Sequence, residues 1–105
     1  MKQERGDKME TILLGSIFLV AGLVLFLFPP KEINNIYGYR TQTSKRNKEN
    51  WKVANRLASR LLILFGGIIA LIAYFTNSNL ITIITMIILG AAIFIIVELN
   101  ISKVN

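Results

Sequence analysis

Residues 61–97 read LLILFGGIIALIAYFTNSNLITIITMIILGAAIFIIV, and this stretch decides the fold. It contains two runs without a charged side chain, residues 61–75 and 80–97, separated only by the short polar sequence NSN at residues 77–79. Two helices joined by so short a connection must run antiparallel. The stretch therefore predicts a helical hairpin.

A third uncharged run, residues 11–28, ends at two consecutive prolines, which cannot continue a helix. Crossing the ~30 Å hydrocarbon core of a bilayer takes ~20 helical residues at ~1.5 Å each, which suits the first and third runs directly. The middle run reaches this length if its helix begins near Trp51 and Arg60 extends its guanidinium to the interface. The sequence thus predicts three membrane spans.

A soluble three-helix bundle is the alternative. A helix of a soluble bundle keeps a polar face, and none of the three runs has one, in a chain that is 53% hydrophobic. We therefore predict a single all-α membrane domain with three transmembrane helices, of which the second and third form an antiparallel hairpin. Its parts are a lead at residues 1–10, spans at residues 11–28, 51–75 and 80–98, a basic loop at residues 29–50 and a tail at residues 99–105.

Basic residues concentrate after the first span. Segment 31–60 holds the whole net charge of +6, because the charges at the two ends of the chain cancel. Lys and Arg near span ends favour the cytoplasmic side. We expect a protein of the cytoplasmic membrane, with the N-terminus outside and the loop and C-terminus inside. Anionic lipid headgroups are the expected partners of this charge, at ~1 kcal/mol per basic residue, and nucleic acid is not.

Residue types needed for common catalytic and metal chemistry are missing. The chain has no Cys and no His, its only Asp is Asp7, and its glutamates are scattered. This removes Ser-His-Asp and Cys-His catalysis as well as His- and Cys-based metal sites. We predict that the chain is not an enzyme and uses neither a metal nor a cofactor.

Small residues recur in the spans, where they allow helices to approach closely. They are Gly15, Gly22, Ser59, Gly66, Ala70, Ala73 and Gly90. This pattern is compatible with a compact bundle and with a homo-oligomer.

Three charged residues are predicted to meet near the loop. Counted outward from the turn at residues 77–79, Glu98 lies at nearly the depth of Arg56 and close to that of Arg60. Arg56 and Arg60 are four residues apart and share a helix face. We predict that Glu98 pairs with one or both; the alternative is that all three meet headgroups and water.

The loop also carries polar and aromatic residues that charge alone does not explain. Gly38, between two tyrosines, predicts a turn with positive φ or a close backbone approach. Arg40 offers a planar fork suited to carboxylate or phosphate. Asn50 is predicted to cap a helix that begins at Trp51.

In order along the chain, Asn34, Gly38-Tyr39-Arg40-Thr41, Ser44, Trp51 and Ala54-Asn55 resemble the SdpI family of bacterial membrane proteins. The family is named for immunity to a secreted sporulation-delaying killing peptide. Many relatives have Pro after the Arg-Thr pair, where this chain has Gln42. The longer relatives have more spans, so the chain resembles a short three-span form.

The resemblance implies a binding, immunity or signalling factor for a membrane-active peptide. Its candidate partners are a cytoplasmic regulatory protein or the toxin peptide itself. The shared site would comprise Asn34, Gly38, Tyr39, Arg40, Thr41, Trp51 and Asn55, with Arg40 as the charged contact. Three alternatives stay open. These residues serve only to fold the loop, the chain is a small transporter or channel subunit, or it is an accessory subunit without its own ligand.

Overall fold

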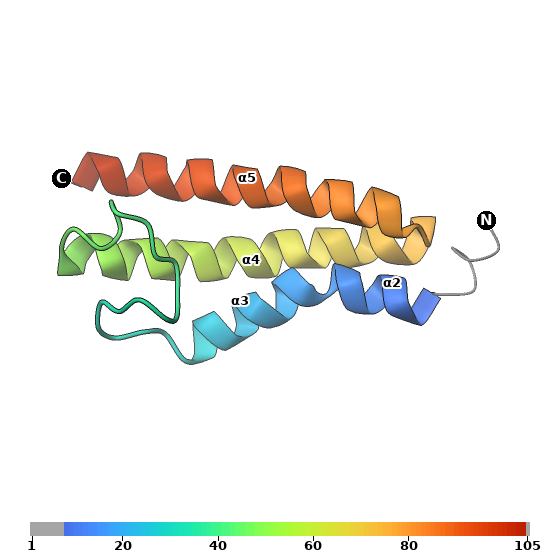
Figure 1. Cartoon of the computed structure of the whole chain (residues 1–105), viewed down its shortest axis with the longest axis horizontal. Coiled ribbons are helices and arrows are strands. Elements are labelled where there is room, and N and C mark those ends of the chain that lie inside the picture. The colour runs from blue at the N-terminus through green and yellow to red at the C-terminus, as the bar shows by residue number, and fades with distance from the viewer. Residues whose placement is uncertain (1–7, 105) are drawn as a thin grey trace.

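The computed structural model describes residues 8–104, and the side chains of residues 8–101. Its helices are α2 (Lys8–Gly15), α3 (Ile17–Leu27), α4 (Lys48–Thr76) and α5 (Asn79–Val104). In Figure 1, α4 lies in the middle, with α5 along one side and α2 and α3 along the other. Helical segments 8–27, 48–76 and 79–101 are long and apolar enough to cross a membrane. The predicted all-α fold with three membrane spans is confirmed.

The first span is built from two helices, whereas the sequence predicted one. The break lies at Ser16, whose backbone N–H donates to the carbonyls of Ile12 and Leu13 at 3.0 and 3.2 Å. Its hydroxyl also donates to the Ile12 carbonyl, at 2.8 Å. A serine hydroxyl that bonds back to the preceding turn commonly bends a helix. Of the predicted lead, residues 1–7 lie outside the described residues.

The second span begins earlier than predicted, because the N-cap is Asn47 rather than Asn50. The Asn47 side-chain oxygen accepts a 2.7 Å hydrogen bond from the Asn50 backbone N–H. The resulting α4 has 29 residues, or ~44 Å at ~1.5 Å per residue, close to the full bilayer thickness of ~40–45 Å. Residues 99–104 of the predicted tail are also helical, since α5 continues to Val104.

The hairpin turns at Asn77, the C-cap of α4. Asn77 is left-handed, with φ 52° and ψ 39°, and its backbone N–H donates to the Ala73 carbonyl at 2.8 Å. Asparagine tolerates this conformation better than other residues with a side chain. Helix α5 then starts at Asn79, which gives the predicted antiparallel pair.

Close contact between the first span and α4 depends on glycine. A Cβ on Gly22 would lie 2.7 Å from the Ile63 nitrogen, and a Cβ on Gly66 would overlap the Leu19 backbone. Glycine thus lets the two backbones approach, as small residues do in membrane bundles. A compact bundle therefore accounts for these positions, and a homo-oligomer stays a prediction.

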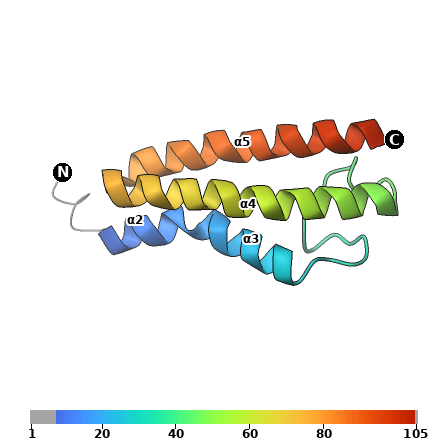
Figure 2. The ribbon, with the colours of Figure 1, turned by 180° about the vertical axis from the view of Figure 1, so that it is seen from behind.

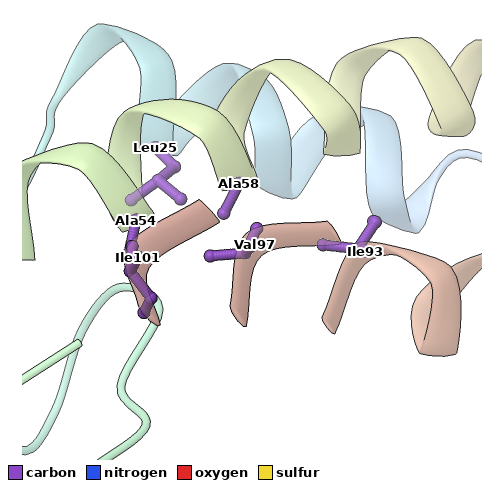
Figure 3. Packing of buried hydrophobic residues seen from close by; sticks show 6 residues of the cluster. All are labelled: Leu25, Ala54, Ala58, Ile93, Val97 and Ile101. Carbon is purple, nitrogen blue, oxygen red and sulfur yellow. The ribbon is translucent and has the colours of Figure 1, made fainter. Parts of the chain in front are cut away.

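The apolar core lies at the end of the bundle that carries the loop. Figure 3 shows its side chains from three helices: Leu25, Ala54, Ala58, Ile93, Val97 and Ile101. Elsewhere, Ile69 is buried, but many large apolar side chains point outward, including Leu71, Phe75 and Ile87 at 59, 77 and 67% exposure. Continuous exposed apolar surface of this kind is what lipid covers. The loop and the C-terminal end of α5 lie at one end of the molecule in Figures 1 and 2, and the hairpin turn at the other.

Candidate functional site

The loop between α3 and α4 starts with a turn made by Asn34. Its side-chain oxygen accepts hydrogen bonds from the backbone N–H groups of Ile36 and Tyr37 at 2.9 and 2.7 Å. Its side-chain amide donates to the Glu32 carbonyl at 2.9 Å. An asparagine that bonds backbone groups just beyond it forms a turn without regular secondary structure. Asn34 therefore shapes the loop from within.

Tyr37 fastens this turn to the end of α3. Its hydroxyl donates to the Phe28 carbonyl at 2.6 Å and lies 3.2 Å from the Val24 carbonyl. The last carbonyls of a helix lack partners within the helix, and the prolines that follow Phe28 have no N–H to offer. The tyrosine hydroxyl therefore supplies a donor that the backbone cannot.

Gly38 allows the loop to pass against α4. Its φ is +106°, and an added Cβ would lie 2.5 Å from the Asn55 side-chain oxygen and 2.7 Å from Cγ of Pro30. The same Asn55 oxygen accepts a 2.6 Å hydrogen bond from the backbone N–H of Tyr39. Both expectations for Gly38, positive φ and close approach, are confirmed.

Two side chains of α4 hold loop backbone. The indole N–H of Trp51 donates to the Pro30 carbonyl at 2.8 Å. The Asn55 side-chain amide donates to the Trp51 carbonyl at 3.0 Å and lies 3.4 Å from the Tyr39 carbonyl. Both side chains are almost completely buried, at 2 and 3% exposure. Their side chains therefore supply hydrogen-bond partners to backbone groups of the loop that would otherwise lie unbonded against α4.

The far side of the loop is fastened to α5 through Glu98. The Tyr39 and Thr41 hydroxyls each donate a 2.7 Å hydrogen bond to the same Glu98 carboxylate oxygen. Hydrogen bonds to an ionised group are roughly twice as strong as neutral ones. Burial, followed by the hydrogen bond to Glu98 and the charge of Glu98, raises the pKa of Tyr39 well above its ordinary value. The phenol is thereby kept protonated, as its role as donor requires.

The predicted pairing of Glu98 with Arg56 or Arg60 is not the arrangement found. Within residues 8–101, Glu98 forms no ion pair with either arginine, and both guanidinium side chains are exposed. Ala54 and Ala58 are the α4 members of the buried core cluster that also contains three α5 residues. Positions two residues apart do not share a helix face, so Arg56 and Arg60 project elsewhere. Counting residues gave the depth of Glu98, but it could not give the rotation of α4.

Arg40 differs from the other predicted site residues. Its side chain is exposed, and its guanidinium folds back to donate to the Ile36 carbonyl at 2.5 Å. It lines a groove of about 560 Å³ whose apolar wall includes Val24 of α3, Leu62 of α4 and Ile93 of α5. Arg40 therefore places a charge beside an apolar groove at the loop end of the bundle.

The model of the SdpI/YfhL protein family matches residues 31–98, which begin in the loop and end at Glu98. The chain belongs to the SdpI/YfhL protein family. The matched segment contains most of the loop, α4 and both ends of the Tyr39–Glu98 contact, and it leaves out α2 and α3.

Two curated relatives come from Bacillus subtilis (strain 168). The uncharacterized protein YfhL is 44% identical over 66 residues, which are 63% of this chain and 60% of that protein. Immunity protein SdpI is 36% identical over 62 residues, which are 59% of this chain and 30% of that protein. The matches thus span less than two thirds of either relative. No solved structure matches the chain.

The seven predicted site residues leave out others that hold this SdpI/YfhL-family loop. Buried Ser44 accepts from the Thr41 backbone N–H at 2.9 Å, while its own N–H lies 3.1 Å from the Thr41 hydroxyl. Buried Asn50 donates to the Thr43 carbonyl at 2.9 Å. The three-residue spacing of Thr41 and Ser44 is typical of local side-chain-to-backbone bonding, and was the available signal. Nothing in the sequence pointed to the contact of Glu98 with the loop.

Proposed function

We propose that this chain is a small membrane-embedded immunity or signalling factor for a membrane-active peptide, acting through its loop at residues 29–47. Membership of the SdpI/YfhL family and the 36% identity to a protein named as an immunity protein support this function. The basic character of the loop supports a cytoplasmic position, where its partner would be a regulatory protein.

One observation carries the assignment of roles within the loop. Five of the seven predicted site residues bond or pack between the loop and the helices, and Asn34 bonds within the loop to shape it. Only Arg40 is exposed, and it bonds only within the loop. A scaffold that holds one guanidinium beside a groove is suited to recognition of a carboxylate or phosphate group. We therefore assign Arg40 as the contact and the other six as positioning residues.

The structure gives less support to a transporter. Transport paths usually place ionisable groups deep within a span. Among the described side chains, the buried polar residues of the spans away from the loop end are hydroxyl-bearing, Thr11, Ser78 and Thr82. Immunity and signalling therefore remain the function that we propose.

The direct test places a photo-crosslinking amino acid at position 40 of the full chain in native membranes. Position 42 is the matched control, because Gln42 is also exposed and lies in the same loop. We expect one specific protein adduct from position 40, little from position 42, and loss of the adduct when Gly38→Ala distorts the loop. Equal labelling of lipid from both positions would contradict the assignment.

A growth assay tests immunity itself. A strain sensitive to the sporulation-delaying killing peptide would express the wild-type chain, Arg40→Ala or Arg40→Lys at matched membrane levels. We expect protection by the wild type, loss with Ala and partial retention with Lys, because Lys keeps the charge but loses the bidentate fork. If the wild-type chain gives no protection, the immunity role is wrong. The crosslinking experiment then still tests the signalling role.

A further inference from the structure

Four basic residues lie at every fourth position along the start of α4: Lys48, Lys52, Arg56 and Arg60. All four are exposed, and together with Lys31 they line one cavity of about 500 Å³. Positions four apart share a helix face. The first turns of α4 thus direct a column of positive charge into a single cavity, separate from the groove beside Arg40.

The rest of the lining of this cavity is mainly apolar. It comes from Leu25 and Phe26 at the end of α3, from Pro29 and Pro30, and from Trp51 of α4, with Asn55 and Ser59 as its polar members. Figures 1 and 2 show α3 diverging from α4 toward this end of the molecule. The cavity therefore has a cationic face and a hydrocarbon face, and its volume lies within the ~300–1,000 Å³ usual for ligand sites.

The positive column has no partner in the fold. Within residues 8–101, none of its four members forms an ion pair with an acidic side chain. Like charges four residues apart on a helix repel and destabilise it. The column thus carries an electrostatic cost that an anion in the cavity would relieve.

The two arginines of the column lie at the depth of the headgroup layer, which is ~5–8 Å thick on each side of the hydrocarbon core. Arg60 borders the uncharged run at residues 61–75, so it lies at the edge of the hydrocarbon. Arg56 lies ~6 Å farther out along the helix and Lys48 ~18 Å, at ~1.5 Å per residue. An amphiphile standing in the bilayer would meet the apolar wall with its chain and the arginines with its headgroup.

We propose that this cavity binds one anionic phospholipid, with its phosphate held by Arg56 and Arg60 and the upper part of an acyl chain against Leu25 and Phe26. Arginine binds phosphate in a bidentate manner, and basic pockets between membrane helices on the cytoplasmic side bind anionic headgroups. Arg40, the contact residue of the proposed function, does not line this cavity, although the positioning residues Trp51 and Asn55 do. The two sites therefore share part of their scaffold but not their contact residues.

The test uses Trp51, which is the only tryptophan of the chain and lines the cavity. The full chain would be placed in phosphatidylcholine nanodiscs that contain a small fraction of phosphatidylglycerol brominated in the upper acyl chain. Bromine quenches indole fluorescence at short range, so we expect stronger quenching by brominated phosphatidylglycerol than by the same amount of brominated phosphatidylcholine.

Two double variants with equal charge loss separate a built site from general attraction. Arg56→Gln with Arg60→Gln should weaken apparent binding about thirtyfold, at roughly fivefold for each basic residue. Lys45→Gln with Arg46→Gln removes the same charge outside the cavity and should change binding less than about twofold. Both variants alter side chains that pack in no core cluster, and circular dichroism checks their helicity.

Two results would overturn the proposal. Equal loss of quenching in both double variants would mean that the membrane surface as a whole attracts the lipid. A change of Trp51 emission by inorganic phosphate or glycerol phosphate in detergent, as strong as that by phosphatidylglycerol, would mean that the site recognises a soluble anion.

Discussion

The hydroxyl of Tyr39 donates a 2.7 Å hydrogen bond to the carboxylate of Glu98, a residue 59 positions farther along the chain. The contact joins the loop after the first span to the third span, while Asn55 joins the same loop to the second. One short backbone segment around Gly38 is thus held by both helices of the hairpin. The shape of the loop therefore depends on the packing of the hairpin.

A double-mutant cycle tests this contact. Tyr39→Phe and Glu98→Gln should each lower the free energy of unfolding by about 1–3 kcal/mol, because each weakens a hydrogen bond to a charged acceptor. The double variant should lose less than the sum, with a coupling energy of about 0.5–3 kcal/mol. Unfolding in mixed micelles measures these values. Additive losses would show that the two residues act independently.

Gly38→Ala should destabilise the loop more than a comparable change elsewhere. The new Cβ would meet Asn55 and Pro30 at a φ of +106°, which should cost about 1–3 kcal/mol. Gly67→Ala is the matched control, because nothing lies within 4 Å of a Cβ at that position. Limited proteolysis after Lys45 or Arg46 reports loop release. Faster cleavage in both variants would contradict the prediction.

The titration of Tyr39 should depend on Glu98. Because burial and the Glu98 carboxylate raise the pKa of Tyr39, the phenol should ionise well above the usual pKa of about 10. This raised pKa contributes stability in full below about pH 10, and the contribution is lost as pH rises through the folded value. The difference in phenolate absorbance between wild type and Tyr39→Phe isolates this group. In a Glu98→Gln background, the difference should move to lower pH.

If the Tyr39 phenol ionises at the same pH in the Glu98→Gln background, burial alone raises its pKa. Circular dichroism across the same pH range would identify any shift caused instead by alkaline unfolding.

The orientation can be tested by cysteine labelling, because the chain has no native cysteine. Gln42→Cys reports the loop end, and Thr76→Cys, at an exposed position, reports the turn end. The excess of basic residues predicts a cytoplasmic loop. A membrane-impermeant maleimide should therefore label Thr76→Cys in intact cells, and Gln42→Cys only after permeabilisation. The reverse pattern would place the loop outside.

Local rules predicted much of this molecule. The uncharged runs, the prolines and the polar turn gave three spans and a hairpin, since lipid requires continuous apolar helices. The turn at Gly38 was predicted from its position between two tyrosines, because glycine adopts positive φ without the steric cost that other residues carry. The N-cap was placed at Asn50 instead of Asn47, since several polar residues in succession can each cap a helix.

By itself, the sequence determined the number of spans, the antiparallel hairpin and the loop as the place of the motif, because hydrophobicity and turn chemistry act over short distances. Only the tertiary structure decided that Glu98 meets Tyr39 and Thr41 and that Arg40 is exposed. It also decided that Arg56 and Arg60 face a separate cavity. The physical reason is the rotation of α4 about its own axis. Residue counting along a helix fixes how deep each side chain lies, but packing of Ala54 and Ala58 against α5 fixes which way each side chain of α4 points.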